Sequence, residues 1–174
     1  MRHYTPAKFA NGMSKDAQIP LDLALYQPDI AQNTGVMLRL GACLGVSIHI
    51  IHPTGFPFSI KAVKRGGLDY LDHAEFTEHD SYAHFTAWRQ DAGRRLVLLT
   101  TRGAVSAYEA DYRDGDVLMV GRESAGVPDA VADAADLRVR IPMRAEMRSL
   151  NVAMAASLVL GEALRQTGAF GRLT

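Results

Sequence analysis

Residues 21–51 read LDLALYQPDIAQNTGVMLRLGACLGVSIHII. The apolar run Leu21–Tyr26 predicts a strand, and Pro28 ends it because proline has no N–H to continue the ladder. A stretch with helical spacing follows and ends at Gly45, a residue that favours the left-handed conformation found after a helix. The β-branched run Val46–Ile51 predicts a second strand. Strand, helix and strand in this order are typical of a parallel β-α-β unit.

The predicted helix has a candidate start and a candidate buried face. Asn33 or Thr34 can cap its N-terminus through a side-chain oxygen. The apolar residues at helical spacing, which predict the buried face, are Val36, Leu40, Cys43 and Leu44. Cys43 is therefore interpreted as a core residue rather than a nucleophile. As the single cysteine it cannot form an internal disulfide, which is typical of a reducing compartment.

The rest of the chain repeats the alternation of short strands and helices. Further strands are predicted at Leu96–Thr100, Val117–Val120 and Leu137–Ile141, and helices at Tyr82–Gln90 and Leu150–Gln166. We therefore expect an α/β fold in which helices sandwich a mostly parallel sheet.

The last predicted helix, Leu150–Gln166, is apolar over most of its circumference. Its main stripe consists of Val152, Ala155, Ala156, Val159, Leu160, Ala163 and Leu164. Met154 and Leu158 lie off this stripe, so little of the first three turns is polar. A helix that is apolar nearly all round is buried on more than one side. A homodimer interface is the interpretation we favour; an unusually enclosed core helix is the alternative.

Length and composition describe one globular domain. The chain has 174 residues, 48% of them hydrophobic and 22% charged, which excludes a disordered or fibrous protein. We expect residues 1–20 to form a polar, mobile extension and residues 21–174 to form a single domain. Residues 1–20 lack the apolar core of a signal peptide, and no stretch approaches the ~20 apolar residues of a membrane helix. The expected location is the cytoplasm.

Charge is balanced overall but segregated along the chain. Lys+Arg and Asp+Glu each number 19, which excludes a uniformly basic nucleic-acid coat. Residues 54–67 nevertheless carry a net charge of +3, residues 138–148 also +3, and residues 69–91 a net charge of −5. Charge runs are usually solvated surface, but this pattern permits one face of the protein to bind a polyanion such as RNA.

Several common motifs are absent from the sequence. There is no Gly-Lys-Ser/Thr P-loop. Glu123 occupies the middle glycine position of a dinucleotide fingerprint between Gly121 and Gly126, which disfavours a nicotinamide oxidoreductase. The six histidines have no zinc-type spacing, and His49, inside a predicted strand, is interpreted as a hydrogen-bonded core residue. Ser124 does not lie in a Gly-x-Ser-x-Gly elbow. No metal is expected.

Three loops marked by glycine or proline follow predicted strands. The first spans 28–35 and leads into the helix that carries Arg39, the second spans 120–128, and the third spans 141–151. Because ligands bind beyond the carboxyl ends of strands in an open α/β sheet, we expect the three loops to form one site.

The residues of these loops resemble the three motifs of the SPOUT RNA methyltransferases. The matching positions are Asn33 and Arg39 in the first, Gly121, Glu123, Gly126 and Pro128 in the second, and Ile141-Pro142-Met143 with Arg148-Ser149-Leu150-Asn151 in the third. Connecting segments also match, among them Leu25–Pro28, His49–Phe56, Lys64–Tyr70 and Leu99–Gly103. Within the superfamily, the chain is most similar to the tRNA (cytidine/uridine-34-2′-O)-methyltransferases, from about Leu21 to Gln166.

This resemblance implies a fold, a cofactor and a reaction. The fold is an α/β knot with a C-terminal trefoil knot, assembled as a homodimer. The methyl donor is S-adenosylmethionine, held at the positions matching Leu99, Gly121, Ile141, Ser149 and Leu150. The reaction is methyl transfer to the ribose 2′-hydroxyl of the wobble nucleotide, so the partner is a tRNA anticodon loop. A ribosomal RNA 2′-O-methyltransferase and a non-catalytic RNA-binding dimer are the alternatives.

The resemblance also assigns roles to side chains. Arg39 is the candidate catalytic residue at the reacting ribose, either as the base or as a clamp on the adjoining phosphate. The clamp is physically easier because a guanidinium normally stays charged. Residues expected to brace the loops are Asn33, Glu123 and Asn151, and those expected to contact the tRNA backbone are Lys64, Arg65, Arg144 and Arg148. Two departures from the usual motifs, Arg122 and Met147, bear on the choice of substrate.

Overall fold

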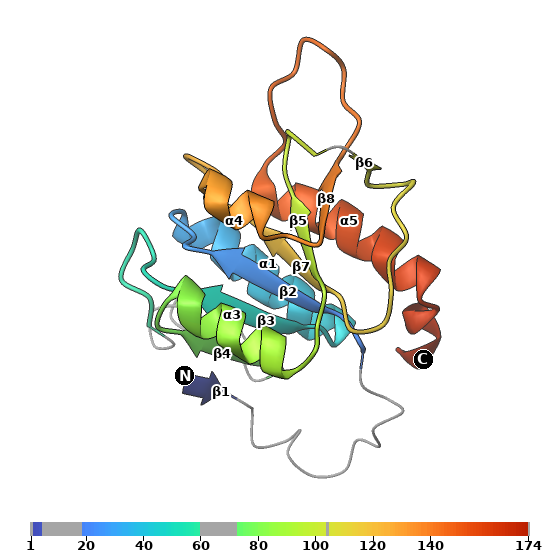
Figure 1. The fold of residues 1–174 in the computed structure, drawn as a ribbon. Helices are drawn as coiled ribbons and strands as arrows, with labels where there is room; N and C mark the ends of the chain where they lie inside the picture. The colour runs from blue at the N-terminus through green and yellow to red at the C-terminus, as the bar shows by residue number, and fades with distance from the viewer. Residues whose placement is uncertain (1, 5–18, 60–72, 104, 174) are drawn as a thin grey trace.

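The computed structural model describes residues 2–4, 19–59, 73–103 and 105–173. Its elements in chain order are β1 (Arg2–Tyr4), β2 (Asp22–Tyr26), α1 (Ala31–Leu44), β3 (Ser47–Ile51), β4 (Phe76–His79), α3 (Tyr82–Asp91), β5 (Leu96–Leu99), β6 (Val105–Ser106), β7 (Val117–Val120), α4 (Asp129–Asp133), β8 (Leu137–Arg140), α5 (Val152–Gln166) and the 3-10 turn η3 (Ala169–Arg172). Figure 1 shows their arrangement.

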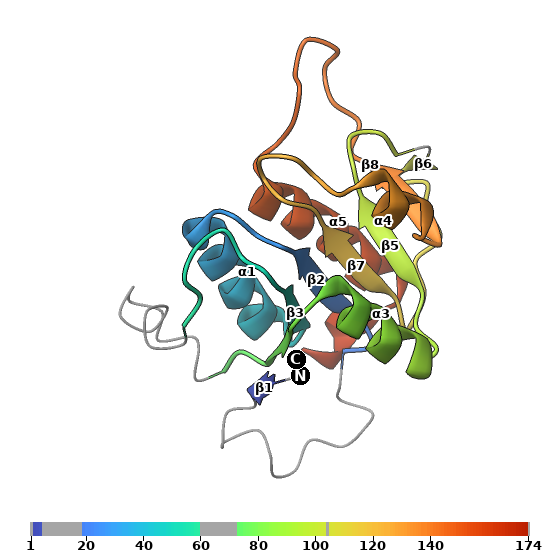
Figure 2. The same ribbon diagram turned by 60° about the vertical axis from the view of Figure 1, so that its left-hand side comes forward.

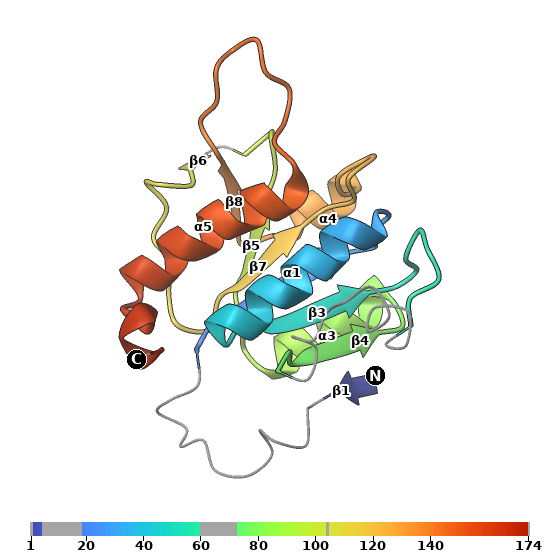
Figure 3. The same ribbon diagram turned by 180° about the vertical axis from the view of Figure 1, so that it is seen from behind.

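The strands form one sheet in the order β1-β4-β3-β2-β7-β5-β8-β6. Strand β1 pairs antiparallel with β4, and every other pairing is parallel. Helices α1 and α5 cover one face of the sheet, and α3 and α4 cover the other (Figures 2 and 3). The predicted α/β class with a mostly parallel sheet is confirmed.

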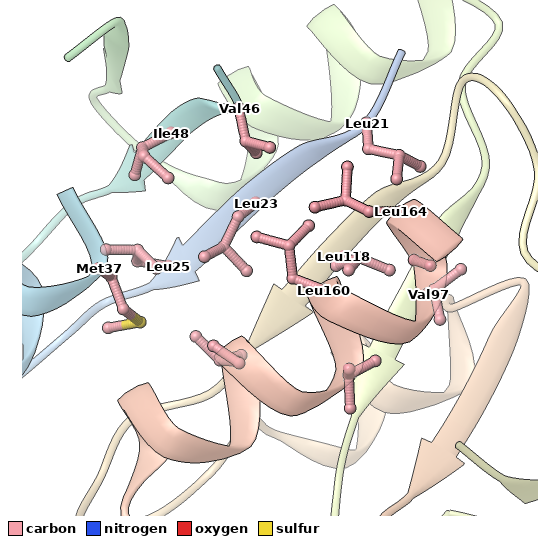
Figure 4. Close-up of a cluster of buried hydrophobic side chains, with 14 of the residues drawn as sticks. Leu21, Leu23, Leu25, Met37, Val46, Ile48, Val97, Leu118, Leu160 and Leu164 are labelled. Atoms are coloured by element: carbon pink, nitrogen blue, oxygen red, sulfur yellow. The ribbon is translucent and has the colours of Figure 1, made fainter. Parts of the chain in front are cut away.

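The main core lies between the sheet and the pair α1 and α5. Side chains of β2 alternate between the two faces, so Leu23 and Leu25 point toward these helices, while Ala24 and Tyr26 belong to the second cluster beneath α3 and α4. Figure 4 shows Leu23 of β2 next to Leu160 of α5, and Leu25 next to Met37 of α1. The predicted stripe of α5 is largely confirmed: Ala156, Val159, Leu160, Ala163 and Leu164 are buried, and Val152 and Ala155 are half-buried.

The buried face predicted for α1 is partly wrong. Val36 and Cys43 are exposed, whereas the buried residues of the helix are Thr34, Gly35, Met37, Leu38 and Gly41. Glycine explains the difference: a Cβ at Gly41 would lie 2.7 Å from the carbonyl oxygen of Val46, so α1 approaches β3 with its small residues. Of the five buried residues only Met37 and Leu38 are strongly apolar, so hydrophobic periodicity alone does not define this face.

The predicted C-terminal end of α1 is confirmed, but its predicted N-cap is wrong. The helix begins at Ala31 after Ile30, so neither Asn33 nor Thr34 is the N-cap; the Asn33 side chain instead contacts other loops. At the C-terminus, Gly45 has φ 64° and its N–H donates to the carbonyl of Gly41, as predicted.

Strands β1 and β4 were not predicted. The sequence Phe-Thr-Glu-His of β4 is short and mixed in polarity, but parallel pairing with β3 stabilises it as a strand. Residues 2–4, which belong to the segment expected to be a mobile extension, pair along β4 as β1. Residues 5–18 lie outside the described residues.

A polar cluster is buried on the α3 face of the sheet. His49 is 4% exposed, with Nδ1 2.9 Å from Nε2 of His79 and Nε2 3.1 Å from Oδ2 of Asp22. Asp22 also accepts a hydrogen bond from Arg94. His49 is thus the hydrogen-bonded core residue that the sequence predicted. In the part of the chain that is described, no helix combines the length and hydropathy needed to span a bilayer.

Candidate cofactor and RNA site

A cavity of about 490 Å³ opens at the carboxyl ends of the parallel strands. It is lined by residues that follow β5, β7 and β8, together with the start of α5 and Ile30 and Asn33 near the start of α1. Because these strands are neighbours in the sheet, their carboxyl ends bring the three loops together. In Figure 1 the loop between β8 and α5 projects beyond this edge.

All five positions that the family resemblance assigned to the cofactor line this cavity: Leu99, Gly121, Ile141, Ser149 and Leu150. They come from β5, the loops after β7 and β8, and the segment before α5. The lining combines apolar residues with glycines and polar residues, an arrangement that suits a flat heteroaromatic ring with polar edges. The residues present therefore fit an adenosine-containing ligand.

The second loop is a closed turn, with two glycines that have different functions. The N–H of Arg122 donates to the carbonyl of Gly126 at 3.0 Å, and the N–H of Gly126 returns a bond of 2.8 Å. A Cβ at Gly121 would lie 2.6 Å from the carbonyl carbon of Gly126, so position 121 requires glycine for close approach. Gly126 has φ 65°, a left-handed conformation that favours glycine.

The three residues expected to brace the loops are connected in one chain of hydrogen bonds. The Asn33 side-chain amide donates to Oε1 of Glu123 at 3.2 Å, and the Asn151 amide donates to Oδ1 of Asn33 at 3.0 Å. Asn151 also caps α5, because its Oδ1 accepts from the N–H groups of Ala153 and Met154. The first, second and third loops are therefore linked directly.

Asp29, which is not among the predicted site residues, also joins this network. Its Oδ1 accepts from the N–H of Glu123 at 3.1 Å, its Oδ2 accepts from the Ser124 hydroxyl, and its own N–H donates to Oε2 of Glu123 at 2.9 Å. These hydrogen bonds with Glu123 and Ser124, and the nearby charge of Arg122, lower the pKa of the Asp29 carboxyl to about 2. An aspartate directly after Pro28 resembles an ordinary turn residue, so only its partners identify it.

Arg39 is not among the described residues that line the cavity. It lies on the exposed side of α1 with Val36 and Cys43. Helices α1 and α5 run side by side (Figure 3), and α5 contributes two further exposed apolar side chains, Met154 at 59% and Leu158 at 45% exposure. Arg39 and these exposed apolar side chains therefore lie outside the lining of the cavity.

The basic residues predicted to contact RNA are only partly described. Lys64 and Arg65 lie outside the described residues. Arg144 and Arg148 are exposed in the loop between β8 and α5, next in sequence to the cavity residues Met143 and Ser149. Arg144 lies 3.8 Å from Glu146, a surface pair of little energetic weight. Among the described residues, no cluster of His, Cys, Asp or Glu has the arrangement of a metal site.

Comparison with known proteins agrees with this geometry. Residues 20–161 match the model of the SpoU rRNA Methylase family. The chain is 54% identical over 152 residues to a tRNA (cytidine(34)-2'-O)-methyltransferase of Ancylobacter novellus, covering 87% of this chain and 96% of that protein. It is 41% identical over 150 residues to the Escherichia coli K12 protein of the same name, covering 85% of this chain and 94% of that protein.

Two solved structures are also similar to this chain. One, described as "Structural insights into the 2-OH methylation of C/U34 on tRNA", has a TM-score of 0.78 and 43% identity, covering 84% of this chain and 95% of that one. An AdoMet-bound rRNA methyltransferase from Sinorhizobium meliloti has a TM-score of 0.75 and 29% identity, covering 83% of this chain and 56% of that one.

Proposed function

The chain belongs to the SpoU rRNA Methylase family, and we propose that it is a tRNA (cytidine(34)-2'-O)-methyltransferase, an enzyme that transfers a methyl group from S-adenosylmethionine to the ribose 2′-hydroxyl of the wobble nucleotide. One observation carries the proposal. The five positions assigned to the cofactor, spread from 99 to 150 in the sequence, line a single cavity in a chain that is 54% identical to a protein of that name.

The proposed ligand of the cavity is S-adenosylmethionine, which supplies an activated methyl group when bound. Leu99, Ile141 and Leu150 provide apolar contacts for the adenine, and backbone groups near Gly121 and Ser149 bind its polar edges and those of the ribose. A volume of about 490 Å³ is in the range of small-molecule sites. The main task of these residues is orientation, which can contribute up to roughly 7–11 kcal/mol to lowering a barrier.

The proposed assembly is a homodimer formed through α1 and α5. Val36, Met154 and Leu158 are each at least 45% exposed, so the single chain leaves apolar surface on two adjacent helices that a second copy would cover. Arg39 lies on the same surface. A dimer formed through this surface gives this arginine a position at the interface.

The proposed role of Arg39 is to clamp a phosphate next to the target ribose. A guanidinium keeps its charge at neutral pH and binds phosphate through two parallel N–H donors. Held in this way, the RNA backbone presents the 2′-oxygen for in-line attack. The exposed Arg144 and Arg148 are proposed to contact the RNA backbone further out, where they set affinity rather than sequence preference.

Two further features complete the proposal. A trefoil knot formed by the segment after β8 is supported by the similarity to SpoU methyltransferases, and a cytoplasmic location is supported by the tRNA substrate of the named relatives. The exposed thiol of Cys43 also suits a reducing compartment.

The decisive experiment is nucleoside mapping by mass spectrometry. Purified protein is incubated with isotopically methyl-labelled S-adenosylmethionine and with tRNA from cells that lack this protein. We expect the label on the ribose of nucleotide 34. Label in ribosomal RNA or at another tRNA position would retain the methyltransferase and reject the wobble assignment. RNA binding without label and without cofactor binding by calorimetry would favour the non-catalytic dimer.

A further inference from the structure

We propose that Asp29 is a positioning residue of the methyl-transfer site, which holds residues 121–126 of the second loop in the conformation that forms one wall of the cofactor cavity. The inference rests on the proposed function. The interaction joins Asp29 in the first loop to Glu123 in the second. Because these residues are 94 positions apart, a short sequence motif cannot reveal it.

The contact between Asp29 and this loop is reciprocal. The two carboxylate oxygens accept from the backbone N–H of Glu123 and from the Ser124 hydroxyl, and the Asp29 N–H donates to the Glu123 carboxylate. Arg122 adds attraction, with its Nε 3.6 Å from Oδ2 of Asp29. Hydrogen bonds to a charged partner are about twice as strong as neutral ones. The position of the loop thus depends on this carboxylate.

Gly55 packs against Asp29 and limits its movement away from the second loop. The N–H of Gly55 donates to the carbonyl of Pro28 at 2.9 Å. A Cβ at position 55 would lie 2.6 Å from the Asp29 Cβ and 2.8 Å from its Cα, so the segment after β3 is in close contact with the aspartate. The Asp29 side chain is only 14% exposed, so the aspartate has little space in which to move away from the second loop.

The loop that Asp29 holds is itself part of the cavity. Gly121, Glu123 and Ser124 all belong to the lining, and Asn33 anchors the other carboxylate oxygen of Glu123. One carboxylate oxygen of Glu123 therefore accepts from Asp29 in the first loop, and the other accepts from Asn33 in the first turn of α1. A loop held in its binding conformation before the ligand arrives loses less conformational entropy on binding, which strengthens affinity.

The test compares Asp29→Ala, Asp29→Asn and Gly55→Ala with the unaltered protein. Alanine removes both acceptors. Asparagine keeps the shape but cannot accept from Ser124 through its amide nitrogen. The Gly55 substitution displaces the aspartate and keeps its charge. Asp111→Ala is the matched control, because Asp111 is an exposed aspartate that, like Asp29, forms an ion pair with an arginine but does not line the cavity.

Two measurements are made on each protein. Hydrogen exchange by mass spectrometry, without ligand, is expected to show exchange at least tenfold faster in the peptide covering 121–126 for Asp29→Ala and Gly55→Ala, with β2 and β7 unchanged. Calorimetry is expected to show about tenfold weaker S-adenosylmethionine binding, with a smaller loss for Asp29→Asn and none for Asp111→Ala. In turnover, KM for S-adenosylmethionine should rise by a larger factor than kcat falls.

Each outcome decides the proposal. Unchanged exchange in 121–126, or unchanged cofactor affinity despite faster exchange, overturns it. If Asp29→Ala fails to fold, Asp29→Asn and Gly55→Ala decide by the same two measurements. If the unaltered protein does not bind S-adenosylmethionine, the proposed function fails, whereas loop exchange in the ligand-free proteins still shows whether Asp29 holds the loop.

Discussion

Gly121→Ala is the smallest change that should disable the cavity without disturbing the core. The added Cβ would lie 2.6 Å from the carbonyl carbon and 2.8 Å from the Cα of Gly126, both backbone atoms that cannot rotate away. Ordinary contacts begin at 3.4 Å, so the turn must open by about 0.8 Å. The two hydrogen bonds between Arg122 and Gly126, now 3.0 and 2.8 Å, would then exceed hydrogen-bond length.

The expected effect is large on activity and modest on stability. A displacement near 1 Å in groups that position a substrate can cost about 100-fold in rate, and we expect a loss of that order in kcat/KM. Two lost backbone hydrogen bonds correspond to about 1–3 kcal/mol of stability. The predicted signature is therefore a folded protein with weak cofactor binding and little turnover.

The assay combines three measurements on Gly121→Ala. These are initial rates of labelled methyl transfer to tRNA, the S-adenosylmethionine Kd by calorimetry, and thermal unfolding. Gly171→Ala is the control, because no atom lies within 4 Å of its added Cβ, and it should match the unaltered protein. A kcat/KM for Gly121→Ala within threefold of the original would refute the reasoning that the tight turn shapes the site.

Three further predictions concern the interface, the candidate clamp and the fold. Arg39→Ala should abolish methyl transfer and weaken tRNA binding in filter assays while cofactor affinity is kept; retained turnover would contradict any role at the ribose. Met154→Lys combined with Leu158→Lys places two charges on the exposed apolar face of α5 and should give monomers in sedimentation velocity, whereas a persistent dimer would locate the interface elsewhere. Asp116 is 1% exposed and accepts two hydrogen bonds from Arg95, so Asp116→Ala should lower the free energy of unfolding by about 3 kcal/mol at fixed protein concentration. A loss below about 1 kcal/mol in urea titrations would show that Arg95 finds other partners.

The elements that were predicted correctly share a local signal. Val117–Val120 is an apolar run between charge and glycine, and Tyr82 begins its helix where predicted. The elements that were missed or assigned the wrong buried face lack such a local signal. Strand β4, Phe76–His79, has mixed polarity and depends on pairing with β3. The buried side of α1 contains Gly35 and Gly41, and Gly41 allows close approach to Ile48 of β3 and to the Val46 carbonyl, an advantage that does not depend on hydrophobicity.

Some features of the site could likewise be predicted from local sequence, and others could not. The loops themselves are visible in the sequence because glycine and proline punctuate them, and Gly121 and Ser149 could be assigned by resemblance to a family. The bracing role of Asp29 could not, since its partner Glu123 is 94 residues away. The position of Arg39 outside the single-chain cavity was likewise not evident from spacing, because helical periodicity does not say which neighbour covers a face.

Local sequence signals were sufficient to predict the α/β class, most of the strands and helices, and the positions of the three loops. These features follow from hydrophobic runs and turn residues, which act over a few positions. The tertiary structure decided which strands are neighbours: β2 lies between β3 and β7, and β5 between β7 and β8. That order places Leu99, Gly121 and Ile141 around one cavity. The physical reason is that strand order depends on the simultaneous burial of distant apolar surfaces, which no local spacing along the chain records.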